Sequence, residues 1–195
     1  MTTIYFIRHA EPNYDNHDDY FRELSEKGIK DRKLVSDYLK DKNITIALSS
    51  PFIRSINTIK DFTDTNNLKI ETIDDFRERK ICNEWIRNFN EYSKRQWSDF
   101  DYKLDEGESL REVQQRNIEA LTDELQKYSN QNIVIGTHGT ALSTIINCYC
   151  PLFNYDAFEQ IRTIMPWIVE FRFDDNECKS IISYNVFTKK HTTIM

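Results

Sequence analysis

Short apolar runs alternate with longer amphipathic stretches along this chain, and this alternation limits the fold more than any other feature of the sequence. Ile133-Val134-Ile135 is a continuous apolar run, typical of a strand buried in the middle of a parallel sheet. Similar runs predict three further strands, at residues 3–7, 43–49 and 69–73. Apolar side chains at helical spacing predict the helices between them, at residues 25–40, from 51, at 109–128 and from 139 or 140. This order favours an α/β fold, with a mainly parallel sheet covered by helices on both faces.

Residues at the ends of these segments support the assignment. Ser109 and Glu112 form the Ser-x-x-Glu pattern of a capping box, which begins a helix. Ser50-Pro51 predicts an N-cap followed by a proline at the first helical position. Near the C-terminus, apolar and polar residues alternate on either side of an acidic turn. This alternation predicts a hairpin made of residues 168–173 and 180–187.

The chain is expected to form a single domain over residues 1–195, because no linker or internal repeat interrupts it. Residues 79–108, rich in aromatic and charged side chains, do not fit the alternation and are predicted to be an insertion. Trp85, Phe89 and Tyr92 stand at helical spacing, which favours a helix packing its aromatic face onto the domain over contact with a substrate. Three basic residues of the insertion, Arg79, Lys80 and Arg87, could bind a second acidic group of a substrate, but solvated surface charges are the favoured interpretation. Asp15, Asp18 and Asp19 are expected on solvated loops.

Charge and composition exclude several functions. The 195 residues include 32 acidic and 26 basic ones, for a net charge of −6, so the chain is a poor candidate for general binding of nucleic acid or anionic membranes. No apolar run is long enough for a signal peptide or a spanning helix, which favours a soluble cytoplasmic protein. The cysteines lack metal-site spacing and are interpreted as reduced structural thiols: Cys82, Cys148, Cys150 and Cys178. The oligomeric state is left open.

Arginines and histidines follow three of the predicted strands. Arg8 and His9 follow the first strand, and Arg54 lies in the first turn of the helix after the second. His138 follows the central strand, at the start of another helix. Because sheets of this kind bind ligands at the carboxyl ends of their strands, we expect these four side chains to meet at one edge.

This set of residues suits phosphoryl chemistry. Guanidinium groups bind phosphate oxygens through paired, charge-assisted hydrogen bonds. Backbone amides of Gly139 and Thr140, at a helix N-terminus, would add further donors for the phosphate. A neutral imidazole is a good nucleophile toward phosphorus, and a second histidine can donate to the transferring group. The leaving oxygen must be protonated by a carboxylic acid, and Glu78, just after the third strand, is placed to supply it.

At these residues the sequence resembles the histidine phosphatase superfamily, the phosphoglycerate mutase-like proteins. The resemblance spans residues 3 to about 146 and rests on four motifs in order: Arg8-His9, the Ser-Ser-Pro-x-x-Arg stretch ending at Arg54, Gly107-Glu108-Ser109 and Thr137-His138-Gly139. It implies a three-layer α/β/α sandwich and catalysis without a metal or other cofactor. By analogy, His9 attacks the phosphate to form a phosphohistidine, and Glu78 matches the family's usual proton donor. Three residues would hold the phosphoryl oxygens: Arg8, Arg54 and His138.

The sequence departs from the family pattern at three places. Ala10 stands where many members have glycine after the nucleophilic histidine. The Gly-x-Trp-Glu-Gly stretch that often follows the acid in mutases is missing, which weakens a mutase assignment and leaves Glu84 as an alternative acid. The polar residue that follows the mutase motif has no single counterpart, since three residues compete for it: Asn13, Asp15 and Asn16.

We therefore expect a phosphomonoesterase that transfers a phosphoryl group from a small phosphorylated metabolite to His9 and then to water. One alternative is a phosphoglycerate mutase-type phosphotransferase, which would return the phosphoryl group to its substrate. Another is a non-catalytic protein that binds a phosphorylated ligand. A metal site formed by His9, His138 and a cysteine is the least favoured.

Overall fold

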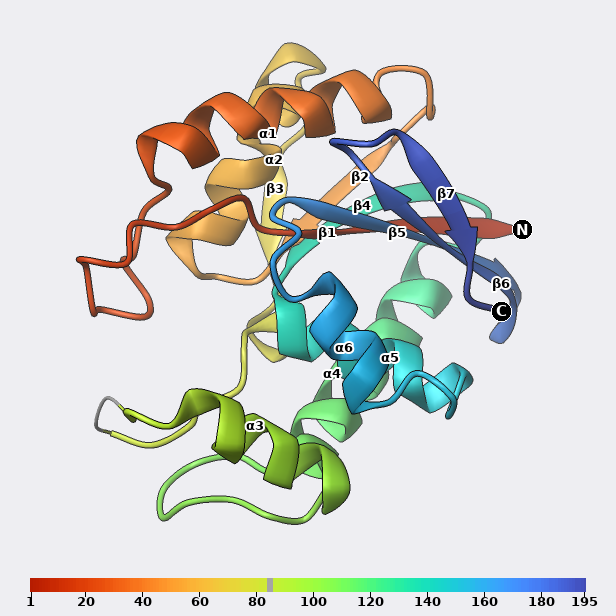
Figure 1. The fold of residues 1–195 in the computed structure, drawn as a ribbon. Helices are drawn as coiled ribbons and strands as arrows, with labels where there is room; N and C mark the ends of the chain where they lie inside the picture. The colour runs from red at the N-terminus through yellow and green to blue at the C-terminus, as the bar shows by residue number, and fades with distance from the viewer. Residues whose placement is uncertain (84–85) are drawn as a thin grey trace.

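The computed structural model describes residues 1–83 and 86–195, and within them a central sheet orders its seven strands as β3-β2-β4-β1-β5-β6-β7 (Figure 1). Four strands form its parallel half: β1 (Thr2–Arg8), β2 (Ile46–Ser49), β3 (Ile70–Thr72) and β4 (Asn132–Thr137). The apolar run at 133–135 lies in β4, where Ile133 pairs with Ile4 of β1 and with Ile46 of β2. These strands match the four that the sequence predicts.

The other half of the sheet is antiparallel, so the sheet as a whole is mixed. β5 (Trp167–Asp174) pairs with β1, and β6 (Glu177–Asn185) pairs with β5, which confirms the predicted hairpin. β7 (Lys190–Thr193) adds an edge strand that the sequence does not predict. Its residues are exposed and carry no alternating apolar pattern. The parallel arrangement that the sequence predicts thus holds for the first four strands.

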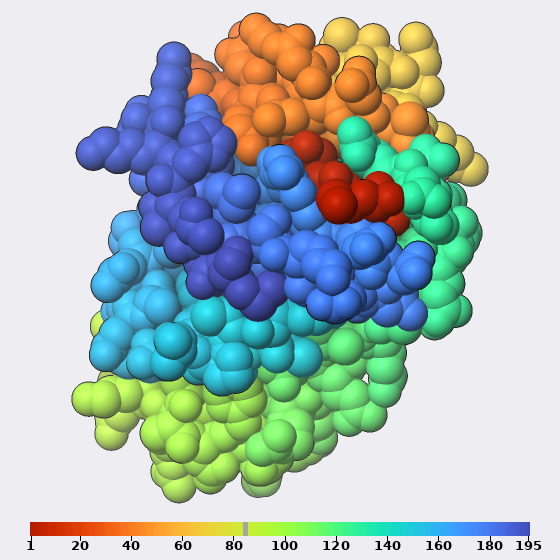
Figure 2. Space-filling model, turned by 90° about the vertical axis from the view of Figure 1, so that its right-hand side faces the viewer, coloured from red at the N-terminus to blue at the C-terminus, as the bar shows by residue number. Residues whose placement is uncertain are grey.

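Helices cover both faces of the sheet, in a three-layer arrangement. α1 (Glu26–Leu39) and α2 (Ile53–Thr65) pack on one face, while α4 (Leu110–Lys127), α5 (Gly139–Tyr149) and α6 (Tyr155–Ile161) pack on the other (Figure 1). In Figure 2, the α1 layer lies above the C-terminal strands, and the α4 and α5 layer lies below them. This arrangement confirms the predicted α/β/α sandwich.

Alternation along the strands divides the core between the two helical layers. In β1, Ile4 and Phe6 belong to the cluster under α4 and α5, whereas Tyr5 and Ile7 belong to the cluster under α1 and α2. Each of the four is 5% exposed or less. Burial of a large apolar side chain stabilises the fold by about 1.5–3 kcal/mol. Packing on both faces therefore holds β1 in place in the sheet, and with it the position of its C-terminal end.

Of the two predicted helix starts, the capping box is confirmed and the serine cap is wrong. Ser109 Oγ accepts from Glu112 N, and the Glu112 side chain accepts from Ser109 N. α2, in contrast, begins at Ile53, with Phe52 as its N-cap residue and no side-chain cap. Ser50 lies too far upstream, and its hydroxyl bonds to a histidine instead.

The predicted insertion contains α3 (Phe89–Ser98), which begins at one of the three aromatic residues at helical spacing. Tyr92 and Trp97 are buried, and the ring of Trp97 packs 5.6 Å from that of Phe158 on α6. Aromatic packing onto the domain is thus confirmed for this part of the predicted helix. Two residues of the sequence interpretation, Glu84 and Trp85, lie outside the described residues.

The described helices include none with the length and apolar character needed to cross a bilayer. All four cysteines are free thiols.

Candidate active site

The predicted strand-end residues meet at one cavity of about 980 Å³, at the carboxyl ends of β1, β2 and β4. Six of them line it: Arg8, His9, Arg54, Glu78, Gly139 and Thr140. The seventh, His138, is fully buried, and its ring centroid lies 5.2 Å from that of His9. The sheet brings together all the side chains that the sequence places at this edge.

His9 directly follows β1 and is held in one orientation by the backbone. Its ring is 7% exposed, and Nδ1 lies 2.7 Å from the carbonyl oxygen of Ala10. A carbonyl only accepts, so Nδ1 carries the proton and Nε2 carries a lone pair. Burial, then the positive charges of Arg54 and Arg8, hold the pKa of His9 well below its usual value. At neutral pH the imidazole is therefore neutral and nucleophilic at Nε2.

Arg8, the last residue of β1, lies against the start of α5. Its Nη1 donates to the carbonyl oxygens of Ile161 and Ile164, at 2.9 and 3.3 Å. A Cβ atom at Gly139 would lie 3.0 Å from both Cζ and Nε of this guanidinium, so a residue with a side chain would displace it. Burial lowers the pKa of Arg8 to about 10, which leaves the group cationic at neutral pH. Arg8 Nε is buried and has no hydrogen-bond partner among the described residues.

Arg54 lies in the first turn of α2 and is 3% exposed. The nearby loop supplies its partner, because Arg54 donates to the carbonyl oxygen of Asp19 and its Nη2 lies 3.1 Å from Asp19 Oδ1. Arg22 Nη1 lies 3.5 Å from the same carboxylate oxygen. Asp19 lies on an exposed loop, as the sequence predicts, and is 54% exposed, but its carboxylate also binds a buried arginine at the edge of the cavity.

His138 is oriented by a chain of hydrogen bonds that begins in the loop before α2. Phe52 N donates to Ser50 Oγ at 3.3 Å, so the Ser50 hydroxyl proton is free to be donated to His138 Nε2, 2.8 Å away. When the Ser50 hydroxyl donates to Nε2, the proton of the neutral ring lies on Nδ1, which is buried and has no partner among the described residues. Burial and the charge of Arg54 lower the pKa of His138, which keeps the ring neutral.

Glu78 is bound by the N-terminus of α5. Its Oε1 accepts from Arg79 N at 2.9 Å and from Ala141 N at 3.2 Å, and its Oε2 accepts from Thr140 N at 3.0 Å. The sequence predicts that the Thr140 amide binds phosphate. In the structure this amide donates to the protein's own Glu78 carboxyl, and a helix N-terminus favours such an acceptor. Oε2 accepts one of these backbone hydrogen bonds and Oε1 accepts two.

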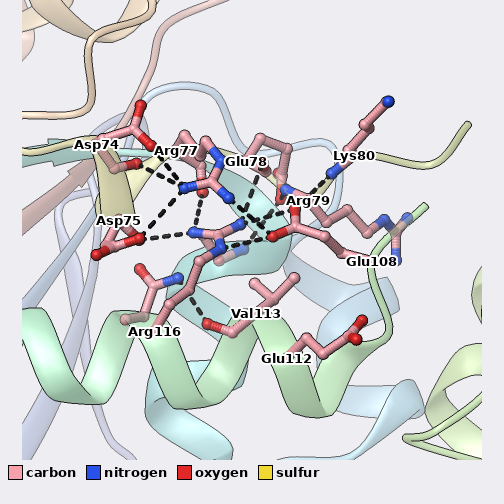
Figure 3. A network of polar contacts seen from close by, with 12 residues as sticks. Asp74, Asp75, Arg77, Glu78, Arg79, Lys80, Glu108, Glu112, Val113 and Arg116 are labelled. Atoms are coloured by element: carbon pink, nitrogen blue, oxygen red, sulfur yellow. Dashed lines mark hydrogen bonds and ion pairs between the residues drawn. The ribbon is translucent and has the colours of Figure 1, made fainter. Parts of the chain in front are cut away.

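A network on α4 fixes the segment that carries Glu78 (Figure 3). Arg116, only 9% exposed, donates to the backbone oxygens of Asp75, Arg77 and Glu78 at 2.6, 3.0 and 3.3 Å. Glu108 accepts from Arg116 Nε at 2.8 Å, from Arg77 at 3.0 Å and from the Lys80 amide at 2.8 Å. The sequence analysis does not identify Arg116 as a functional residue. The one sequence feature that points to it is the Gly107-Glu108-Ser109 motif, whose Glu108 binds it.

Gly107 permits this network because a Cβ at this position would lie 2.0 Å from the carbonyl oxygen of Ile81. The close approach lets Glu108 N donate to Lys80 O at 2.7 Å. A glycine is therefore required where the two segments meet.

Two other positions at which the sequence departs from the family pattern lie near the cavity. Ala10 is buried, and its amide donates to Thr58 Oγ1 at 2.9 Å. The cavity is lined by Tyr14 and His17 rather than by the three residues that compete for the polar position: Asn13, Asp15 and Asn16. The described residues contain no group of three or more histidine, cysteine or acidic side chains placed to hold a metal ion.

Of the three basic residues interpreted as solvated, Arg79 is not. Arg79 and Lys80 both line the cavity, but Lys80 and Arg87 are exposed whereas Arg79 is 3% exposed. The sequence interpretation is wrong for Arg79 because burial of an arginine by two aromatic side chains further along the chain leaves no local sequence signal.

Comparison with known proteins places this architecture in a family. Residues 4–185 match the model of the histidine phosphatase superfamily (branch 1). The chain is 26% identical over 150 residues to the uncharacterized phosphatase PhoE of Bacillus subtilis, covering 75% of this chain and 76% of that one. It is 25% identical over 169 residues to phosphoserine phosphatase 1 of Hydrogenobacter thermophilus, covering 80% and 78%.

Solved structures share the fold. A mutant phosphoserine phosphatase from Entamoeba histolytica in complex with phosphoserine has a TM-score of 0.74 at 20% identity, covering 93% of this chain and 96% of that one. The Entamoeba histolytica phosphoserine phosphatase in complex with 3-phosphoglyceric acid has a TM-score of 0.75 at 22% identity, with the same coverage. These matches confirm the fold class that the sequence predicts.

Proposed function

The chain belongs to the histidine phosphatase superfamily, and we propose that it hydrolyses small phosphomonoesters through a phosphohistidine formed on His9. One observation supports this most: a neutral imidazole, with Nδ1 bonded to a carbonyl, lies at a cavity beside two buried guanidinium groups. Neutral Nε2 supplies the nucleophile, and the guanidinium groups supply positive charge for the phosphoryl oxygens. The family and its phosphatase relatives favour hydrolysis over the silent binding protein that the sequence leaves open.

In the first step, the Nε2 lone pair of His9 attacks phosphorus as the bond from phosphorus to the ester oxygen breaks. Arg8 and Arg54 bind the phosphoryl oxygens, and the Nδ1–H of His138 donates to one of them. A proton on Glu78 Oε2 passes to the leaving oxygen, so an alcohol departs and Glu78 becomes a carboxylate. To make room on Arg54, the incoming phosphate displaces the Asp19 carboxylate.

In the second step, water attacks the phosphohistidine. Glu78 takes a proton from the water as its oxygen bonds to phosphorus, and the bond between phosphorus and Nε2 breaks. Inorganic phosphate is released, and His9 and Glu78 return to their starting states. No step requires a metal ion or another cofactor.

The substrate is a phosphorylated small molecule. The cavity, at about 980 Å³, is large enough to hold a small organic group beside the phosphate. Two structural neighbours are complexes with phosphoserine and with 3-phosphoglyceric acid, and one curated relative is a phosphoserine phosphatase. These small molecules each carry one phosphate, which supports the same class of substrate here.

The test is turnover of p-nitrophenyl phosphate by the wild-type protein and by His9→Ala. We expect the substitution to reduce kcat by about 10⁴-fold or more, because it removes the nucleophile. His191→Ala, on the exposed edge strand β7, is the matched histidine control and should keep full activity. Retention of activity in His9→Ala would refute the mechanism.

Incubation with 3-phosphoglycerate separates hydrolysis from mutase-type transfer. Release of inorganic phosphate is the expected result. Formation of 2-phosphoglycerate without free phosphate would contradict the proposal and favour the mutase.

A further inference from the structure

Arg79 is a buried cation that the proposed mechanism does not use. It lines the cavity next to Glu78, is 3% exposed, and forms no ion pair with a described residue. Its Nη1 donates to Gln96 Oε1 at 2.6 Å, and its buried Nη2 has no partner among the described residues. Figure 3 shows its side chain leaving the Glu108–Arg116 network on the side away from Asp74 and Asp75.

The surrounding residues hold the Arg79 guanidinium in place. Gln96 is fully buried, and its Nε2 donates to the carbonyl oxygens of Tyr102 and Glu108 at 3.1 and 2.9 Å. These two bonds orient the amide so that Oε1 faces Arg79. The rings of Phe89 and Tyr92 each lie 5.4 Å from the guanidinium carbon. Arg79 is thus pre-positioned, with the buried Nη2 left to donate.

A buried charge with no carboxylate within ion-pair distance is unfavourable, and an anion bound beside it offsets part of that cost. Arg8 and Arg54 are assigned to the phosphate in the proposed function, so Arg79 is available for a second acidic group. A single guanidinium matches the single charge and planar oxygens of a carboxylate. The adjacent Lys80 is exposed, and no further buried cation joins Arg79 on this part of the described wall.

The position of Arg79 also indicates which part of the substrate it would reach. Arg79 and Glu78 line the same cavity, and the charge of Glu78 acts on the Arg79 guanidinium. Because Glu78 would protonate the leaving oxygen, a group bound by Arg79 belongs to the leaving part of the substrate, near the ester oxygen.

We propose that Arg79 binds a carboxylate of the substrate, so that the protein prefers phosphate esters of short hydroxy acids or hydroxy amino acids. This inference rests on the proposed function, because it assumes that the phosphate occupies the His9 end of the cavity.

The test compares esters that differ only in the carboxylate. O-Phosphoserine is matched by phosphoethanolamine, and 3-phosphoglycerate is matched by glycerol 3-phosphate. We expect wild-type kcat/KM to be higher for the carboxylate member of each pair. Arg79→Gln should reduce this preference at least tenfold, mainly through KM, and Arg79→Lys should recover part of it because it retains the charge.

Arg162→Gln is the matched control. Arg162 also lines the cavity, but its Nε already lies 3.3 Å from Glu159 Oε1. This control should leave the preference unchanged. The inference would be overturned if Arg162→Gln lost the carboxylate preference as much as Arg79→Gln does. It would also be overturned if Arg79→Gln lowered kcat/KM equally for both members of each pair, or if the wild type showed no preference.

Binding measurements separate this inference from the proposed function. Calorimetric titration of O-phosphoserine into His9→Ala, with and without Arg79→Gln, needs no turnover. Arg79-dependent binding by a protein whose wild type hydrolyses no ester would refute the proposed function and support the carboxylate site. If the wild type hydrolyses aryl phosphate but binding of O-phosphoserine does not depend on Arg79, the proposed function is supported and the carboxylate site is refuted.

Discussion

The cavity has two walls that are built in different ways. The reactive wall consists of side chains that directly follow strands or begin helices of the central sheet: Arg8, His9, Arg54 and His138. The opposite wall comes from the segment after Glu78, from Phe89 at the start of α3, and from α6 with the turn that follows it. The first wall rests on β1, β2 and β4, strands that are largely buried, whereas the second is held by individual side-chain bonds.

This difference suggests a division of roles. Phosphoryl transfer is the same reaction for every ester, so the side chains that carry it out are best placed on rigid elements, at the ends of strands. The organic part of the substrate varies, and residues on connecting segments are suited to recognising it. Substitutions at the reactive wall should therefore affect all substrates, whereas on the opposite wall the substitution of Arg79, the residue proposed to bind the organic part, should change selectivity.

After His9→Ala, the largest effect is expected from Glu78→Gln, because the amide cannot supply a proton to the leaving oxygen. For alkyl esters such as glycerol 3-phosphate, kcat should fall by about 10²- to 10⁴-fold. For p-nitrophenyl phosphate, whose leaving group needs little protonation, the fall should be much smaller. Steady-state kinetics on both substrates checks this, and an equal loss on both would indicate a structural role for Glu78.

Arg54→Gln should reduce kcat/KM for every ester by about 10²- to 10³-fold, since it removes a buried donor to the phosphoryl group. It should also move the pH profile. Arg54 holds the pKa of His9 below its usual value, so removing this cation raises that pKa. Protonated His9 is not nucleophilic, and the acidic limb of kcat/KM should therefore shift to higher pH. A limb that stays in place or shifts to lower pH would contradict the electrostatic account of His9.

Arg116→Gln tests whether the α4 network positions the acid. Loss of the bonds to the backbone of residues 75–78 should displace Glu78 and reduce kcat for alkyl esters by about 10- to 100-fold. Aryl phosphate turnover should fall less. Arg111→Gln, on the same helix but paired with Asp101 at the surface, is the control and should behave as wild type. Equal losses on alkyl and aryl esters would show that Arg116 does not act through Glu78.

Asp19→Asn should have the smallest effect. Asp19 is 54% exposed and competes with phosphate for Arg54, and ion pairs of this kind contribute about 0.2–1 kcal/mol. The inhibition constant of inorganic phosphate should therefore decrease about two- to threefold. Asp15→Asn, a substitution at an exposed residue of the same loop, should leave it unchanged. A weaker inhibition by phosphate in Asp19→Asn would mean that Asp19 assists binding.

The sequence predicts the reactive wall well because its signals are local. A strand pattern followed at once by Arg8-His9, or by His138, places a side chain at a known edge of the sheet. The same logic predicts the first four strands and the capping box at Ser109. Each of these depends on periodicity or on residues only a few positions apart.

The opposite wall cannot be predicted in this way because its contacts join distant segments. The position of the Arg79 guanidinium depends on Gln96, and the position of Glu78 depends on Arg116. Glu78 accepts a hydrogen bond from Thr140 N at the N-terminus of α5, and these two residues are 62 positions apart in the sequence. No local pattern indicates which carboxylate will reach a given helix terminus.

The central claim is that the phosphoryl group passes through His9. The most direct test is rapid mixing with a ³²P-labelled substrate, quenching in alkali to preserve the nitrogen–phosphorus bond, and peptide mapping. The account predicts transient label on the peptide that contains His9, and none in His9→Ala. Label on another residue, or turnover with no labelled enzyme at any time, would contradict it.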